Sequence, residues 1–148
     1  MEAEISFKTD DGTVSYSKQK LIKHSTMIKD LLVDSDADDN TSIKIDWAER
    51  RIVSIVFDFI DLLEQHQESS ARLTYDILQI EPLPPMYTAF IDVQTHTDME
   101  TLLKVLKFAD FLYIEKIKLC IVRYLDLLTR ENNEDAIRKI CVSTLTDD

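Results

Sequence analysis

Glycine is almost absent from this chain, with one residue, Gly12, among 148. A dinucleotide-binding fingerprint needs several glycines so that the backbone can approach the pyrophosphate, and a Walker phosphate loop needs at least two. A single glycine therefore excludes both kinds of nucleotide site. Cysteine is scarce as well. Cys120 and Cys141 are too few for a disulfide framework, so we expect two buried thiols in a reducing compartment.

Positively charged residues are outnumbered: the chain has 17 Lys and Arg residues and 28 Asp and Glu residues, which gives a formal net charge of −11. Binding to nucleic acid or to an anionic membrane surface depends on clustered Lys and Arg, and the longest basic cluster is Arg50-Arg51. We therefore expect neither partner. The sequence also lacks an apolar run long enough to span a membrane and a basic-then-apolar secretory signal at its N-terminus, which predicts a cytoplasmic and nuclear protein.

Residues at metal-binding or catalytic spacing are missing too. The three histidines are far apart, and none shares a metal-ligand spacing with another histidine or with a cysteine. Three aspartates open like a calcium loop: Asp34, Asp36 and Asp38. That loop needs Gly at its sixth position and Glu at its twelfth, where this chain has Asp39 and Ile45. Cys120 lies among apolar residues, which raise the pKa of a thiol. We predict no metal, no cofactor and no enzymatic activity.

The N-terminal segment 5–17 predicts a β-hairpin. Ile5 and Phe7 alternate with polar residues in the first half, and Val14 and Tyr16 do so in the second. An Asp-Gly pair lies between the two runs, which is typical of a primed turn in which glycine takes a positive φ angle. The only glycine of the chain is therefore expected at the hairpin turn.

Apolar spacing predicts most of the remaining elements. Helices are expected over 17–24, over 25–32 from a Ser25 cap, over 46–66 from an Asp46 cap, over 98–112 from an Asp98 cap, over 114–128, and over 133–141 from an Asn133 cap. A third strand is expected over 42–46, and 86–93 is interpreted as a short helix or an extended piece. The stretch 65–85 is predicted to be a long connection with one docked or strand-like piece at 74–80.

The predicted helix over 46–66 is apolar nearly all round. Only Ser54, Asp58 and Asp61 share a narrow polar sector on a helical wheel that starts at residue 52. A helix with this pattern packs against neighbours on several sides. We therefore expect it to be the central helix of the domain.

The predicted helix over 114–128 carries an apolar surplus. Seven residues fill one arc of about 160° by the helical periodicity: Ile117, Cys120, Ile121, Tyr124, Leu125, Leu127 and Leu128. Leu119 and Val122 interrupt the opposite face. Two interpretations stay open, because the helix can be packed between its neighbours, or part of its surface can be the docking site of a partner.

Three blocks of the sequence resemble motifs of one family. The block ISFKTDDGTVSY, followed by STMIKDLL, is similar to an I-x-L-x-S-x-D-G-x-x-F strand pair and an S-x-T-I-K-x-M-L helix. The run TLLKVLKFADFLYIEKIKL over 101–119 resembles T-L-F-E-L-I-L-A-A-N-Y-L-D-I-K-G-L-L, and EDAIRKI over 134–140 resembles P-E-E-I-R-K-T-F. These motifs, in this order, are those of the Skp-one family, the adaptor subunits of SCF (Skp, cullin, F-box) ubiquitin ligases.

The resemblance implies a fold and a division of the chain. The expected fold class is α+β, a BTB/POZ-like domain in which helices surround a small three-stranded sheet, with a C-terminal helical extension. The BTB/POZ-like core would cover 1–96, with an insert at about 65–85. Closing helices and a Skp-type extension would cover 97–148.

The resemblance also implies partners and contact residues. The family's Asn-Tyr pair that contacts a cullin falls on Asp110 and Phe111. Its F-box-binding surface falls on seven apolar residues: Ile117, Ile121, Tyr124, Leu125, Leu128, Ile137 and Ile140. The expected function is that of a non-catalytic adaptor between an F-box substrate receptor and a cullin. The alternative is a structural or assembly protein of the same fold that self-associates, as a homodimer through the apolar tail or the BTB face, or that binds a partner outside ubiquitin ligation.

Overall fold

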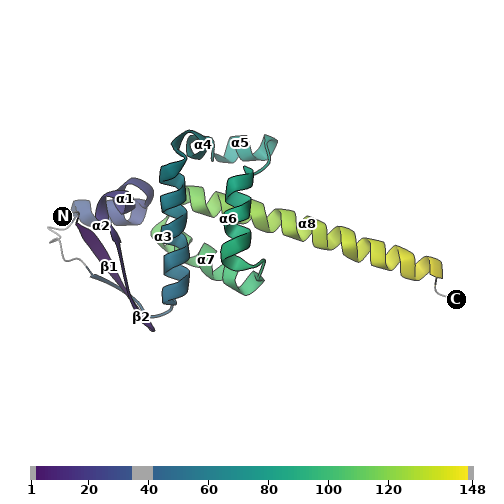
Figure 1. Ribbon diagram of the computed structural model, residues 1–148, viewed down its shortest axis with the longest axis horizontal. Helices are drawn as coiled ribbons and strands as arrows, with labels where there is room; N and C mark the ends of the chain where they lie inside the picture. The colour runs from purple at the N-terminus through teal and green to yellow at the C-terminus, as the bar shows by residue number, and fades with distance from the viewer. Residues whose placement is uncertain (1–2, 35–41, 147–148) are drawn as a thin grey trace.

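The computed structural model describes the backbone of residues 3–34 and 42–146 and the side chains of residues 3–32 and 42–130. A small sheet lies at one end, helices pack beside it, and one long helix runs away from them (Figure 1). The elements are β1 (Glu4–Thr9), β2 (Gly12–Ser17), α1 (Lys18–His24), α2 (Thr26–Asp34), β3 (Ser42–Ile45), α3 (Arg50–Gln65), α4 (Gln67–Ala71), α5 (Tyr75–Ile80), α6 (Pro85–Thr95), α7 (Met99–Leu112) and α8 (Glu115–Thr146). The expected α+β class with a three-stranded sheet is confirmed.

The sheet has the strand order β2-β1-β3, with β1 antiparallel to β2 and parallel to β3. Ile5 pairs with Tyr16 and Phe7 with Val14, so these four side chains share one face of the sheet. Ile5 and Phe7 are fully buried there, and Val14 and Tyr16 pack against the buried core. The predicted hairpin is confirmed.

The predicted turn is wrong in detail. Thr9 pairs with Gly12, so the two turn residues are Asp10 and Asp11, and neither has a positive φ angle. Gly12 is instead the first residue of β2, with a φ angle of +152°. A Cβ atom there would lie 3.2 Å from the Cδ atom of Arg50. Glycine is needed because the strand begins in a conformation that other residues rarely adopt, close to the first residue of α3.

The start of α3 was placed too early by the sequence. The helix begins at Arg50, and neither its N-cap residue Glu49 nor the predicted Asp46 makes a capping hydrogen bond there. The Oδ1 atom of Asp11 accepts a hydrogen bond from the backbone N–H of Arg50 at 2.7 Å. The hairpin turn therefore supplies the acceptor for this helix terminus, a role that a local N-cap usually has.

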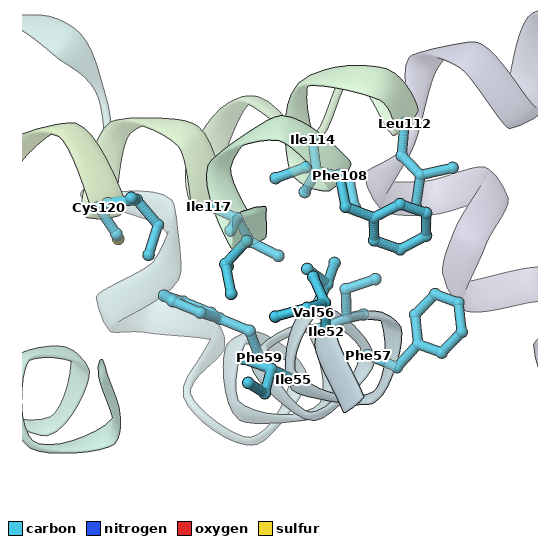
Figure 2. Packing of buried hydrophobic residues seen from close by; sticks show 14 of the residues in the cluster. Ile52, Ile55, Val56, Phe57, Phe59, Phe108, Leu112, Ile114, Ile117 and Cys120 are labelled. Carbon is cyan, nitrogen blue, oxygen red and sulfur yellow. The ribbon is translucent and has the colours of Figure 1, made fainter. Parts of the chain in front are cut away.

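Helix α3 is the central helix, as predicted. Its buried side chains surround most of the helix: Ile52, Val53, Ile55, Val56, Phe57, Phe59, Ile60 and Leu63. Figure 2 shows Ile52, Val56 and Phe59 of α3 facing Phe108 of α7, Ile117 of α8, and Ile114 between these two helices. The Phe57 ring centroid lies 5.2 Å from that of Phe7 and 6.1 Å from that of Phe108, so the sheet and α7 share one core through α3.

Two of the predicted helix caps, Ser25 and Asp98, are confirmed, and Ser17 is a further cap that was not predicted from the sequence. The Ser17 side chain accepts from the N–H of Lys20, and the Asp98 side chain accepts from the N–H of Thr101. The Ser25 hydroxyl accepts from the N–H of Ile28 and donates to the carbonyl oxygen of Leu112. The second bond ties the start of α2 to the end of α7, at a buried position.

The insert over 65–85 contains two short helices, α4 and α5. The piece at 74–80 was expected to dock or to be strand-like, and it is the short helix α5, capped by Thr74, whose side chain accepts from the N–H of Ile77. Leu78 of α5 is buried, which docks the insert on the rest of the chain. The next segment, whose conformation the sequence left open, is the helix α6.

The C-terminal helix is longer than predicted. A separate helix was expected from a cap at Asn133, but α8 continues without a break from Glu115 to Thr146. The sequence of α8 contains neither glycine nor proline, so nothing in it stops the helix. The break before α8 falls at Tyr113, which has a left-handed φ angle of 57°. Over the described residues, no helix is both long and apolar enough to cross a bilayer. The division of the chain after residue 96 stays a prediction.

Candidate protein-binding surfaces

The titratable side chains of the described residues include one buried thiol and one half-buried histidine. Within residues 3–32 and 42–130, no three His, Cys, Asp or Glu side chains are placed to hold a metal ion. Cys120 is buried, and burial raises the pKa of its thiol to about 12. The His24 ring lies 2.6 Å from the Glu64 carboxylate, and burial lowers the pKa of this histidine. Exposed apolar side chains of the described residues are a separate feature, and clusters of such side chains often mark binding sites.

The apolar arc of α8 is mostly core. Ile117, Ile121 and Tyr124 are buried, and Figure 2 shows Ile117 and Cys120 on the side of α8 that faces α3. The Tyr124 hydroxyl donates a hydrogen bond to the Asp92 carboxylate, which brings α6 over the same face. These three expected F-box contacts are thus covered by the chain itself, as the packed interpretation of this helix requires.

Of the other four expected F-box contacts, two are half-buried and two have side chains outside the described residues. Leu125 and Leu128 are half-buried and pack against the edge of the core. The side chains of Ile137 and Ile140 lie outside the described residues. In the described part of the chain, the predicted F-box set therefore offers only two leucine side chains at the surface.

An exposed apolar strip lies on the opposite side of α8, between α8 and α7. Leu103 of α7 and Val122 of α8 are 51% and 53% exposed. They line a cavity of about 380 Å³, which we call the α7–α8 groove. Its lining residues are Leu103, Leu106, Lys107, Asp110, Lys118 and Val122. The sequence contained a signal for this surface, because Val122 and its neighbour Leu119 were the apolar residues outside the arc.

A second cavity continues this strip toward the insert. It has a volume of about 410 Å³ and lies between α5 and α8, with Tyr75 and Leu78 on one side and Leu119 on the other. Lys118 and Val122 line both cavities, so the two form one connected surface across α5, α8 and α7. Leu119 is half-buried and packs on the core below it.

The two expected cullin contacts, Asp110 and Phe111, have different neighbours. The Asp110 carboxylate accepts a hydrogen bond from Lys118 Nζ at 2.8 Å and lines the α7–α8 groove. This hydrogen bond raises the pKa of the Lys118 ammonium group. Phe111 is 37% exposed, and its ring packs edge-on against Trp47, with centroids 5.2 Å apart. The structure thus brings Phe111 together with Trp47 and leaves Asp110 with Lys118.

Trp47 was not identified from the sequence. It lies in the loop between β3 and α3 and is 42% exposed. The buried Phe108 ring lies 6.3 Å from both the Trp47 and the Phe111 ring centroids and supports the pair from below. Lys107 lies over the Trp47 ring, with its Nζ atom 4.7 Å from the centroid. We call Trp47, Lys107 and Phe111 the aromatic patch. The only tryptophan of the chain, next to polar residues just after a strand, was the available signal.

Ion pairs near the aromatic patch are exposed. Lys104 Nζ lies 2.6 Å from Glu49 Oε1 and 3.3 Å from Glu100 Oε1. The Lys104 hydrogen bond lowers the pKa of Glu49, and the Glu49 bond raises the pKa of Lys104. Exposed pairs of this kind contribute little to folding. Their effect is to neutralise Lys104 at the rim of the patch.

Comparison with known proteins adds no family to these observations. No protein-family model matches the chain, and no curated protein matches it. The functional conclusion therefore depends on the residues and on the geometry of the two surfaces.

Proposed function

We propose that this chain is a non-catalytic adaptor of the Skp-one type, with a BTB/POZ-like core, that links an F-box substrate receptor to a cullin scaffold in an SCF-type ubiquitin ligase. The order of the elements supports this proposal. A hairpin, two short helices, a strand parallel to β1, a central helix, an insert and a final pair of packed helices follow one another as the resemblance implies. A small sheet with helices around it fits the same fold.

The observation that carries the proposal is that α7 contributes to two exposed surfaces on different sides of the helix, with Lys107 at the border between them. Leu103 and Leu106 line the α7–α8 groove, while Phe111 belongs to the aromatic patch. At 100° per residue, Phe111 lies roughly 90° around α7 from the groove residues. A receptor contact centred on Leu103 and Leu106 and a scaffold contact centred on Phe111 therefore lie on different sides of the same helix and meet at Lys107, and an adaptor requires two such sites.

The mechanism is geometric. Phe108, Ala109 and Leu112 are fully buried and fix α7 against the core, so both surfaces are held by one rigid element. A receptor in the α7–α8 groove and a scaffold on the aromatic patch then have a fixed relative orientation. Fixed orientation places the receptor's substrate near the end of the assembly that transfers ubiquitin.

The cullin arm of the proposal is tested by calorimetric titration with a cullin N-terminal domain. We expect Phe111→Ala to weaken binding by about 2 kcal/mol or more, as for a buried aromatic hot spot. The melting temperature of the variant should change little, because Phe111 lies outside the buried core. An unchanged affinity would show that Phe111 does not contact the cullin.

The receptor arm is tested with a matched pair of valines. Val122 lines the α7–α8 groove, whereas Val93 lies on α6, lines none of the described cavities and is 65% exposed. We expect Val122→Asp to weaken binding of an F-box protein at least tenfold and Val93→Asp to leave it unchanged. Equal effects of the two substitutions would argue against the groove as the receptor site.

The self-associating alternative has a distinct signature. Light scattering of the isolated chain measures its mass in solution. A stable dimer that captures neither an F-box protein nor a cullin domain would overturn the adaptor proposal and support a structural protein.

A further inference from the structure

Lys107 differs from the other lysines on the two surfaces. Lys104 pairs with Glu49 and Glu100, and Lys118 pairs with Asp110. In the described part of the chain, no carboxylate lies within 4.0 Å of Lys107 Nζ, and its nearest recorded interaction is with the Trp47 ring. Of the three lysines on these two surfaces, Lys107 is the one whose ammonium group lies over an aromatic ring and not beside a carboxylate.

The aromatic patch has the physical properties of a binding hot spot. Trp47 and Phe111 present two large rings, and the buried Phe108 holds both of them in place. Side chains that are already immobilised lose little conformational entropy when a partner covers them. Tryptophan is also among the residues most enriched at hot spots.

Covering the patch would change the surroundings of Lys107. An ammonium group over a tryptophan face is stabilised by the ring quadrupole, and this attraction grows when water is removed. An unpaired cation in an interface is costly unless the partner supplies a carboxylate. The charge of the patch is therefore complementary to an apolar segment that carries an acidic side chain.

We propose that Trp47 and Lys107 form, together with Phe111, one docking surface for the cullin scaffold, and that the docked segment places a carboxylate opposite Lys107. This inference rests on the proposed adaptor function. It goes beyond it because it names two contact residues, Trp47 and Lys107, that are not among the expected cullin contacts, and because it states the chemistry of the scaffold segment that they bind.

The single tryptophan allows a test without any substitution. The protein is labelled with 5-fluorotryptophan, which gives one ¹⁹F resonance because Trp47 is the only tryptophan. We expect the resonance to shift or broaden during titration with an unlabelled cullin N-terminal domain, with the same midpoint as calorimetric binding.

The two possible failures are distinguishable. An unchanged ¹⁹F resonance at concentrations where calorimetry detects binding would overturn the inference and leave the adaptor function standing. Absence of any calorimetric binding would overturn the adaptor function, and the inference with it.

A matched pair of charge reversals tests the role of Lys107. We expect Lys107→Glu to weaken cullin binding at least tenfold at about 0.15 M salt, where charges farther away than a Debye length are screened. Lys8→Glu makes the same charge change at an exposed residue of β1 and should alter the affinity less than twofold. Equal effects of the two variants would reflect net charge alone and would overturn the assignment of Lys107.

The aromatic contribution has its own pair of variants. We expect Trp47→Ala to weaken cullin binding at least tenfold and Trp47→Phe to recover part of the loss, because the ring surface is retained. Trp47 lies outside the buried core, so both variants should keep the melting temperature of the parent. Full affinity in a folded Trp47→Ala variant would overturn the inference. If that variant does not fold, the ¹⁹F titration of the parent chain decides.

Discussion

The first half of α8 has one face that the chain buries and one that it leaves exposed. Ile117, Cys120 and Tyr124 lie on the buried face, where α3 and α6 cover them. Lys118 and Val122 lie on the other face and line two connected cavities. Both faces are partly apolar, so apolar content does not distinguish core from surface in this helix.

The contrast between the buried and the exposed face of α8 indicates which apolar residues of a helix are available to a partner. A helix at the edge of a domain needs one apolar stripe of about 100° to pack on its core. The broad arc of α8 supplies that stripe. Val122 lies outside that stripe and is 53% exposed, whereas Leu119 is half-buried and packs against the core. Exposed apolar residues outside the stripe, such as Val122, are the ones that mark a docking surface.

The largest contrast between the two faces should be in thiol reactivity. In a Cys141→Ser variant, Cys120 is the only thiol, and it is buried with its pKa raised to about 12. We expect its reaction with a disulfide reagent at pH 8 to be roughly 1,000-fold slower than in urea, because reaction requires an opening that costs several kcal/mol.

A thiol on the exposed face provides the control for this measurement. Val122→Cys, combined with Cys120→Ser and Cys141→Ser, should react nearly as fast folded as unfolded. Similar folded-state rates for the two thiols would show that α8 is not packed on the face described here.

Truncation on the buried face should have the next largest effect. We expect Ile117→Ala to lower the free energy of unfolding by about 2–4 kcal/mol, because the lost side chain leaves a cavity between α8 and α3. Urea denaturation followed by circular dichroism measures this change. A loss below about 1 kcal/mol would place Ile117 outside the core.

The hydroxyl of Tyr124 should matter less than its ring. Tyr124→Phe removes the hydrogen bond to Asp92 but keeps the buried ring, and Asp92 is exposed enough to be hydrated. We expect a loss of about 1.5 kcal/mol in the free energy of unfolding, in the range for hydrogen bonds to charged groups. A thermal melt of the variant beside Ile117→Ala would rank the two contributions.

The smallest effect on stability is expected on the exposed face. Val122→Ala should change the free energy of unfolding by less than about 0.5 kcal/mol, as is usual for surface substitutions. The same variant should weaken binding of an F-box protein if the α7–α8 groove is its site. If Val122→Ala lowered the free energy of unfolding and left F-box binding unchanged, Val122 would belong to the core and not to a binding surface.

Much of the fold could be predicted because its signals are local. The alternating apolar residues of the hairpin, the caps at Ser25 and Asp98, and the all-round apolar pattern of α3 each lie within a few residues of the element they define. The cap of α3 could not be predicted, because its acceptor is Asp11, which lies 39 residues before Arg50 in the sequence.

The other errors have similar physical causes. Residues 74–80 are rich in β-branched and aromatic side chains, which favour a strand, but the Thr74 cap and the docking of Leu78 stabilise a helix. At the candidate sites, Phe111 is partly exposed on α7, and its expected contact with a cullin stays a prediction. Trp47 was missed because its proximity to Phe111 arises from tertiary packing between a loop and a helix.

Because α8 is long, a small rotation at its packed end produces a larger displacement at its C-terminal end. Its 32 residues form one helix of about 48 Å at 1.5 Å per residue, and the part after residue 130 is about 24 Å long. Figure 1 shows this helix running away from the other elements to the C-terminal end. A tilt of about 5° at the packed end would move the last turn by about 2 Å. Small adjustments beside the α7–α8 groove are therefore amplified at the tip of α8.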